Sequence, residues 1–283
     1  METPAWMNGT WAAESNTRLP LDDAMVTHGA GLVEVLRTWG GIPVFLDRHL
    51  DRFLQATSEM GLRLPVDRKQ LTPLVREYLR RLPAPLAGQD RHVVLLATPG
   101  SPGQQTATLV IHGRPLDSAR HRDYQQSGVA LERSKVKALP SEVAPARWKH
   151  RNRLHWYLAA KQRGGLALLE TTTGIVTETA LGHVVMVEEK AGRLVLVAPP
   201  EELVLPGITL EVVRELAGEM RLGWERRPFH WEELAGASEL LLLGSGFGVA
   251  GVSRLDDAAI PWPGQVTQNM AARFAALVGQ AKE

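Results

Sequence analysis

The first half of the chain alternates short apolar runs with segments in which apolar residues recur every three or four positions. The short runs are bounded by turn residues and predict strands at residues 32–39, 42–46, 93–97 and 107–112. The helical spacing predicts one helix that is capped by Asp47 and reaches Met60, and another at residues 68–82. Asn8-Gly9, between two short apolar stretches, is typical of a tight hairpin turn.

The second half mixes the same two patterns. Apolar runs predict strands at residues 129–134, 184–187, 194–197 and 240–243. Helical spacing predicts helices at residues 152–162, 209–221 and 266–278, and Thr209 is the expected N-cap of the second. Hairpins with separate helices, rather than strict alternation of strand and helix, indicate an α+β fold.

A polar segment without periodicity, residues 114–126, separates the two halves. Interdomain linkers are often polar and exposed. We therefore expect a small N-terminal α/β domain at residues 1–116, a linker at residues 117–126, and a larger mixed β/α domain at residues 127–283.

Composition and charge exclude several classes of protein. The 283 residues carry a formal net charge of +1, which gives no electrostatic basis for binding nucleic acid. Cysteine is absent, which excludes disulfides and thiolate chemistry and fits a reducing cytosol. No apolar run approaches the roughly 20 residues of a membrane span, and residues 1–6 do not resemble a signal peptide. We expect a cytoplasmic protein with no nucleic-acid or membrane partner. Its histidines show no metal-binding spacing, so we expect no metal.

The candidate chemistry begins at Lys149, in the sequence Arg-Trp-Lys-His-Arg-Asn-Arg-Leu of residues 147–154. Glu178 follows, then the small-residue turns of residues 205–209 and 243–246. An amine can form a Schiff base with the aldehyde of pyridoxal 5'-phosphate (PLP), and the arginines around Lys149 favour its neutral form. A carboxylate can face the pyridine nitrogen, and backbone N–H groups in the turns can bind phosphate.

Each motif also has a simpler explanation when it is taken alone. The basic stretch around Lys149 can be a solvated surface or a patch for an anionic partner. Glu178 can be an exposed residue at the end of a strand, and the glycines can be ordinary turns. The order of the motifs along the chain is what favours a PLP site.

In that order the motifs resemble the class IV aminotransferases, the fold-type IV PLP enzymes, which include branched-chain and D-amino-acid aminotransferases and aminodeoxychorismate lyase. The resemblance covers nearly the whole chain and implies a homodimer that holds PLP between its two domains. It makes Lys149 the catalytic lysine and Glu178 the acid at the ring nitrogen. It further implies that the cofactor is bound by Arg52 (in a His-x-x-Arg pattern), Arg153, Ile208, Thr209, Ser245 and Gly246. Arg153 stands where branched-chain enzymes have a tyrosine near the phenolic oxygen.

The residues expected to contact the substrate differ from the family pattern more than those expected to bind PLP. By resemblance, the substrate residues are His28, Val33, Val35 and Thr98. The family's Gly-x-Gly-x-x-Glu pattern appears at residues 29–34, but Ala30 replaces its usual aspartate and Val33 its usual aromatic residue. Pro99 stands where many relatives have an arginine that binds the substrate carboxylate. His183 replaces a usual asparagine after Glu178.

The resemblance therefore implies a PLP-dependent aminotransferase that moves an amino group between an amino acid or amine and a 2-keto acid. Aminodeoxychorismate lyase is the close alternative, because Lys-His-x-Asn-Arg-Leu is nearest to that branch of the family. Val35 opposes it, since the lyase branch prefers a threonine there that can supply a proton. A non-catalytic PLP-binding protein is a further alternative, because the substrate positions are altered.

Overall fold

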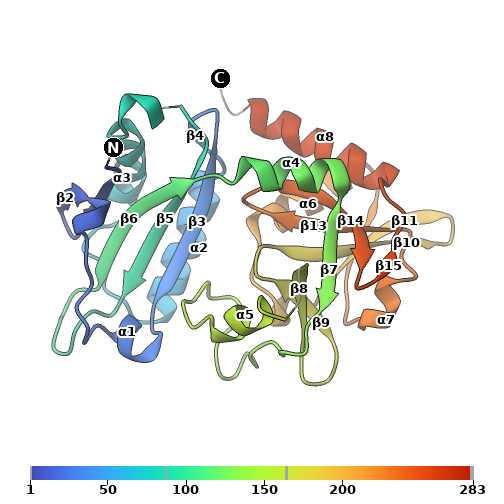
Figure 1. The fold of residues 1–283 in the computed structure, drawn as a ribbon, viewed down its shortest axis with the longest axis horizontal. Helices are drawn as coiled ribbons and strands as arrows, with labels where there is room; N and C mark the ends of the chain where they lie inside the picture. The colour runs from blue at the N-terminus through green and yellow to red at the C-terminus, as the bar shows by residue number, and fades with distance from the viewer. Residues whose placement is uncertain (1, 87, 163–164, 281–283) are drawn as a thin grey trace. The chain divides into compact units, whose positions relative to one another are not determined.

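The computed structural model describes residues 2–86, 88–162 and 165–280, and within them the chain forms two compact units (Figure 1). Unit 1 comprises Met1–Leu116 and Trp148–Arg153, and unit 2 comprises Asp117–Arg147 and Leu154–Ala281. The outermost ends of the two expected domains, residue 1 and residues 281–283, lie outside the described residues. Both helices and sheets are present, as an α+β fold requires.

Unit 1 is built on a sheet that has six strands within the described residues, in the order β2-β1-β6-β5-β3-β4. The strands are β1 Pro4–Met7, β2 Thr10–Ala13, β3 Leu32–Trp39, β4 Ile42–Pro43, β5 Arg91–Thr98 and β6 Thr108–Pro115. The helices are α1 Ala24–His28, α2 Leu46–Glu59 and α3 Arg68–Arg80, with 3-10 turns at Glu14–Asn16 and Ala84–Leu86. Figure 1 shows α2 running along one face of this sheet.

The alternation of side chains along β3 gives the sheet of unit 1 its two apolar faces. Leu32 and Leu36 pack in the core formed with α2 and α3, to which Phe53 and Tyr78 also belong. Val33 packs in the smaller cluster on the other face. Even-numbered positions of this strand therefore face the helices.

Unit 2 contains a larger sheet and more helices. Its strands are β7 Val129–Arg133, β8 Leu166–Glu170, β9 Val176–Thr179, β10 His183–Lys190, β11 Arg193–Ala198, β12 Gly223–Arg226, β13 Glu239–Gly244, β14 Gly248–Leu255 and β15 Ala258–Ala259. Its helices are α4 Ser118–Ser127, α5 Leu154–Ala159, α6 Ile208–Glu219, α7 Trp231–Leu234 and α8 Gln265–Gln280, with a 3-10 turn at Glu201–Leu203. In the part of the chain that is described, no helix is long and apolar enough to cross a membrane.

The sheet of unit 2 closes on itself. Its strands follow the order β12-β11-β10-β13-β14-β7-β8-β9, and β9 also pairs with β10. Strands β10, β13, β14, β7, β8 and β9 therefore form a ring. The closing pair is His183 of β10 opposite Glu178 of β9. The pair that closes the ring therefore contains Glu178, the acid predicted from the sequence.

Several elements begin or end elsewhere than the sequence predicts. The expected strand at residues 42–46 is only Ile42–Pro43, because the chain turns into α2 through Phe45, which has a positive φ of 49°. Asp47 is therefore not the cap but a first-turn residue of α2, and it accepts a hydrogen bond from Arg68 at 2.7 Å. The helix expected at residues 152–162 is limited to α5.

Two further differences concern unit 2. Gly207, and not Thr209, is the N-cap of α6, so Thr209 lies inside the first turn.

The expected linker at residues 117–126 is mostly the helix α4, which belongs to unit 2. Asp117 caps α4 by accepting from the N–H of Arg120 at 3.1 Å. No residue of α4 is buried, so the helix shows no apolar periodicity, although the rings of Tyr124 and His121 lie beside Phe247 of the core of unit 2.

Candidate functional site

Lys149 is held against the start of β3 by backbone hydrogen bonds within unit 1. Its carbonyl oxygen accepts from the N–H of Val33 at 2.7 Å, and the N–H of Arg151 donates to the Gly31 carbonyl at 2.7 Å. Between them, His150 forms an antiparallel bridge with Leu32. The Lys149 segment therefore extends the sheet beside the Gly-x-Gly-x-x-Glu pattern, although it is far from it in sequence.

Glu34 links this pattern to α2. Its side chain is 1% exposed and faces α2, as its even-numbered position on β3 requires. Arg52 donates to both carboxylate oxygens, from Nε at 2.9 Å and from Nη2 at 2.7 Å. Nδ1 of His49 lies 2.9 Å from Oε1 of the same carboxylate. The His-x-x-Arg motif thus presents two side chains of one helix face to a single buried acid.

The pKa values of this group reflect its burial and its charges. Burial by itself would raise the pKa of Glu34, but Arg52 and His49 outweigh it and hold this pKa well below its usual range. Burial lowers the pKa of His49 even though the charge of Glu34 opposes the shift. The charges of Arg52 and Lys149 contribute to the same lowering, so the amine of Lys149 acts electrostatically on this group.

Glu178 has a histidine as its neighbour in unit 2. Nε2 of His183 lies 3.1 Å from Oε2 of Glu178 and 2.7 Å from the carbonyl oxygen of Leu205. The His183 side chain is 6% exposed and that of Glu178 is 21% exposed. Thr179 fixes the turn between the two residues, because its hydroxyl donates to the Gly182 carbonyl at 2.8 Å and accepts from the Gly182 N–H at 3.0 Å.

Three loops of unit 2 meet around His183. A Cβ atom added to Gly182 would collide with the Leu243 carbonyl, so the turn after Glu178 lies directly against the end of β13 and the turn that follows it. A Cβ added to Gly207 would lie 2.5 Å from Cε1 of His183, so the start of α6 also packs on this imidazole. The acid and the two small-residue turns are therefore gathered at one end of β10 and β13.

The groups in these loops fit an anion. No side chain caps α6, so the first N–H groups of the helix, at Ile208 and Thr209, point outward with the positive end of the helix dipole. Thr209 is 4% exposed, and Ser245 is partly exposed in the second turn. Hydroxyls beside a helix start can donate to the oxygens of a phosphate.

The residues expected on the substrate side lie in unit 1. Val33 is buried in the smaller apolar cluster, and Val35 packs against that cluster while partly exposed. Thr98 is fully buried, and its hydroxyl donates to the carboxylate of Asp23. His28 is exposed at the end of α1, with Nδ1 2.7 Å from the hydroxyl of Thr27. The Thr98 hydroxyl therefore holds α1 in place.

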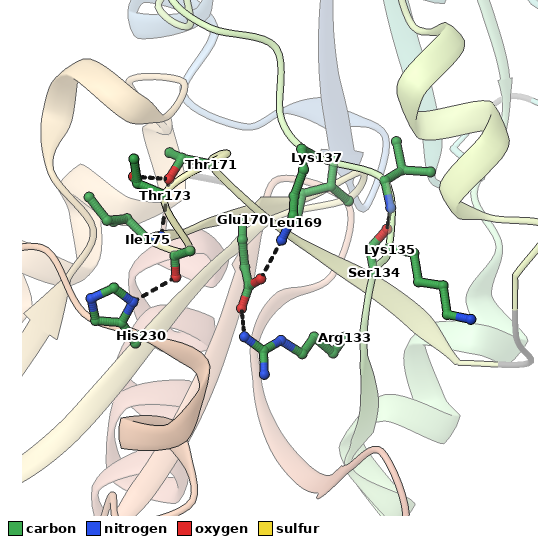
Figure 2. Close-up of polar contacts among 12 residues, drawn as sticks. Arg133, Ser134, Lys135, Lys137, Leu169, Glu170, Thr171, Thr173, Ile175 and His230 are labelled. Atoms are coloured by element: carbon green, nitrogen blue, oxygen red, sulfur yellow. Dashed lines mark hydrogen bonds and ion pairs between the residues drawn. The ribbon is translucent and has the colours of Figure 1, made fainter.

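A second polar cluster in unit 2 involves residues that the motifs do not include (Figure 2). Glu170, at the end of β8, is fully buried and lies 2.9 Å from Nη2 of Arg133 and 2.8 Å from Nζ of Lys137. Its backbone carbonyl accepts from the N–H of Ala138 at 2.8 Å. Both cations are about 40% exposed. Because Arg133 ends β7 and Lys137 follows it, their contacts with Glu170 anchor the segment after β7 on the end of β8.

Sequence reasoning missed the partners that fix these side chains. His49 and Glu34 belong to the His-x-x-Arg and Gly-x-Gly-x-x-Glu patterns. Glu34 is the single acid in the apolar run of residues 32–36, which was a signal that this carboxylate would need charged partners. His183 was noted only as a departure from the family. Within the described ranges, no cluster of three or more histidines, aspartates or glutamates could hold a metal ion.

Most of the chain matches one family of known proteins. Residues 31–255 match the model of the amino-transferase class IV family. The chain belongs to this family. It is accordingly a PLP-dependent class IV aminotransferase, and no comparison favours the lyase or the non-catalytic alternative.

The similar proteins cover the chain almost completely. A D-alanine aminotransferase of Staphylococcus epidermidis is 24% identical over 262 residues, which are 90% of this chain and 89% of that protein. The crystal structure of a branched-chain aminotransferase from Thermoproteus uzoniensis with norvaline has a TM-score of 0.88 at 23% identity and covers 100% of this chain and 97% of its own. A PLP-bound hypothetical aminotransferase from Mycobacterium tuberculosis has a TM-score of 0.85 at 20% identity, covering 98% and 99%. These structures confirm the predicted fold class.

Proposed function

We propose that Lys149 is the lysine to which PLP bonds through its aldehyde carbon, and that Lys149 also moves the proton between the substrate Cα and the C4' carbon of the cofactor. When bound, PLP supplies an electron-accepting ring that stabilises negative charge at the substrate Cα. The backbone pairing of residues 149–151 with Gly31–Val33 carries this proposal, because it anchors the amine on a sheet instead of leaving it in a mobile basic loop.

Glu178 is the group we assign to the pyridine nitrogen. A carboxylate there keeps the nitrogen protonated, which strengthens the ring as an electron acceptor. Its support is the pairing with His183 and its place beside two loops rich in N–H groups. Arg153, which belongs to the Lys149 segment, is assigned to the phenolic oxygen by resemblance alone.

The phosphate is assigned to three sets of donors. The first is the start of α6, with Ile208 and Thr209, and the second is the turn with Ser245 and Gly246. The third is Arg52, whose guanidinium donates to Glu34 from Nε and Nη2. Backbone N–H groups, hydroxyls and a guanidinium are the donors that proteins commonly use for phosphate.

The substrate we propose is an amino acid with an aliphatic side chain, paired with a 2-keto acid. The relatives named above act on D-alanine and on branched-chain amino acids, which are both aliphatic. The apolar surroundings of Val33 and Val35 support the same class. Pro99 cannot bind a carboxylate as an arginine does, so we assign that task to other groups, with His28 and Thr98 bounding the site. The resemblance implies a homodimer, and the absence of cysteine fits a cytoplasmic location.

Borohydride trapping tests the assignment of Lys149. The protein should purify with a visible absorption band from bound PLP, and reduction should fix the label on a peptide that contains Lys149. Lys149→Ala should lose both the trapped label and amino transfer, whereas the control Lys135→Ala, at an exposed lysine of unit 2, should keep both. Label on another lysine, or no PLP binding by the parent protein, would contradict the proposal.

A further inference from the structure

We propose that His183 is a positioning residue that fixes Glu178 relative to the start of α6 and so sets the spacing between the acid for the ring nitrogen and the donors for the phosphate. This inference rests on the proposed function of Glu178 and α6. It adds a residue that lies where the family's usual asparagine stands.

The contacts of the imidazole carry the inference. Nε2 faces Oε2 of Glu178 at 3.1 Å and the Leu205 carbonyl at 2.7 Å. The ring also packs on Gly207, the N-cap of α6, so tightly that a side chain there would have to displace it. One buried side chain therefore touches the acid, the loop before the helix and the helix start.

The protonation of Nε2 follows from its neighbours. A carboxylate oxygen and a carbonyl oxygen are both acceptors, so Nε2 must carry the proton in order to interact with them favourably. An N–H directed at Glu178 stabilises the carboxylate form of that residue. The carboxylate form is the one that can keep a pyridine nitrogen protonated.

The surroundings of His183 hold it in one place. The main chain of His183 pairs with Glu178 on one side and with Leu243 on the other. The turn between Glu178 and His183 is closed by the Thr179 hydroxyl and lies against β13. Neither the acid nor the imidazole can shift without disturbing this end of the sheet, so the spacing is built into the fold.

Two conservative replacements separate positioning from simple packing. Glutamine places its amide nitrogen about where Nε2 of a histidine lies, so His183→Gln can still donate to Glu178 and Leu205. Asparagine is shorter and ends near the position of Nδ1, so His183→Asn keeps a polar side chain but loses this reach. Val187→Ala, at a fully buried position further along β10, is a matched control for destabilisation of the strand.

The decisive measurement is the affinity of the apoprotein for PLP, compared among the three variants. His183→Asn should bind PLP about tenfold more weakly, as expected for loss of a hydrogen bond to a charged group, and His183→Gln should restore most of the affinity. Val187→Ala should lower the melting temperature without the tenfold loss of PLP affinity.

A double-mutant cycle tests the coupling to Glu178. His183→Asn should cost less PLP affinity in a Glu178→Gln background than alone, because the shared interaction is already lost. If the two effects add, or if His183→Asn affects only the melting temperature as Val187→Ala does, the inference fails. If Glu178→Gln itself leaves affinity and turnover unchanged, the proposed role of Glu178 fails instead.

Discussion

The Glu34 side chain shows how a buried charge is tolerated in this fold. Burial of an ionised carboxylate is costly unless charged partners and hydrogen bonds compensate for it. Arg52 and His49 supply both, and the N–H of Val35 donates to Oε1 at 2.9 Å. Because Arg52 donates to this carboxylate, the same acid orients the guanidinium that we propose for the phosphate.

Stability at low pH should depend on Glu34. Its folded-state pKa is held below its ordinary value, so it stabilises the folded state above pH 4.5, its pKa when unperturbed, and this contribution is lost as the pH falls through the folded pKa. The pKa of His49 is also lowered, so acidification below about 6.5 removes stability through this residue as well.

Glu34→Gln tests this dependence. At neutral pH the variant should unfold with about 3 kcal/mol less free energy than the parent, since one partner of a buried ion pair has lost its charge. The difference should shrink progressively as the pH falls below about 5, and it should still be shrinking at the lowest accessible pH, because the parent loses the same contribution as the pH falls toward its folded-state pKa. Urea unfolding at several pH values measures it, and parallel profiles for the two proteins would argue against this role.

At the residue scale, the motifs indicated candidate positions but not the side chains that contact them. The sequence alone could associate Lys149, Glu178 and Arg52 with a cofactor, because their motifs are short and local. It could not show that Arg52 is paired with Glu34 or that His183 faces Glu178, because those contacts depend on how strands and helices pack. The spacing of three residues between His49 and Arg52 did predict that both lie on one helix face.

The start of helix α8 is capped by a residue of the distant strand β13. Glu239, the first residue of β13, accepts from the N–H groups of Val266 and Thr267 at 2.8 Å each and from the Thr267 hydroxyl at 2.8 Å. A carboxylate at the start of a helix satisfies unpaired N–H groups and complements the helix dipole. Here the capping acid comes from a strand and not from the residue that precedes the helix.

Glu239→Ala should therefore loosen α8 selectively. The expected loss is about 1–3 kcal/mol in the free energy of unfolding, because two buried N–H groups lose their acceptor. Amide hydrogen exchange should accelerate in the first turn of α8 and remain unchanged in α6. The control Glu189→Ala, at an exposed position of β10, should have neither effect. Uniform acceleration across unit 2 would mean that Glu239 has no special relation to α8.

At the element scale, the predictions succeeded where apolar patterning was strong. The strand at residues 32–39, the hairpin of β10 and β11, and the long helix α8 were anticipated by their patterns. The helix α4 was missed because it has no buried residue. The N-cap of α6 lies two residues before the predicted Thr209, because Gly207 caps the helix without a side chain. Polar helices and glycine caps leave little signal in a hydrophobic pattern.

At the scale of the whole molecule, an aminotransferase should complete half of its reaction without a second substrate. Val35, by contrast, has no proton to give to a departing pyruvate. We expect an aliphatic amino donor to yield one equivalent of 2-keto acid per bound PLP when no acceptor is present, as in a ping-pong half-reaction. Chromatography of the keto acid measures it. Abundant 4-aminobenzoate from aminodeoxychorismate, without any keto acid from a broad panel of donors, would assign the protein to the lyase branch.

The ring of strands in unit 2 has a consequence for the order in which the chain can fold. The pair that closes it, β9 with β10, is a local hairpin that can form as soon as it is synthesised. The pairing of β7 with β14, in contrast, joins Val129 to Val252. Contacts of such sequence separation form slowly. On the ribosome, the acid and its histidine would thus be paired long before β7 acquires its second neighbour, and until β14 emerges one edge of β7 stays open to wrong partners.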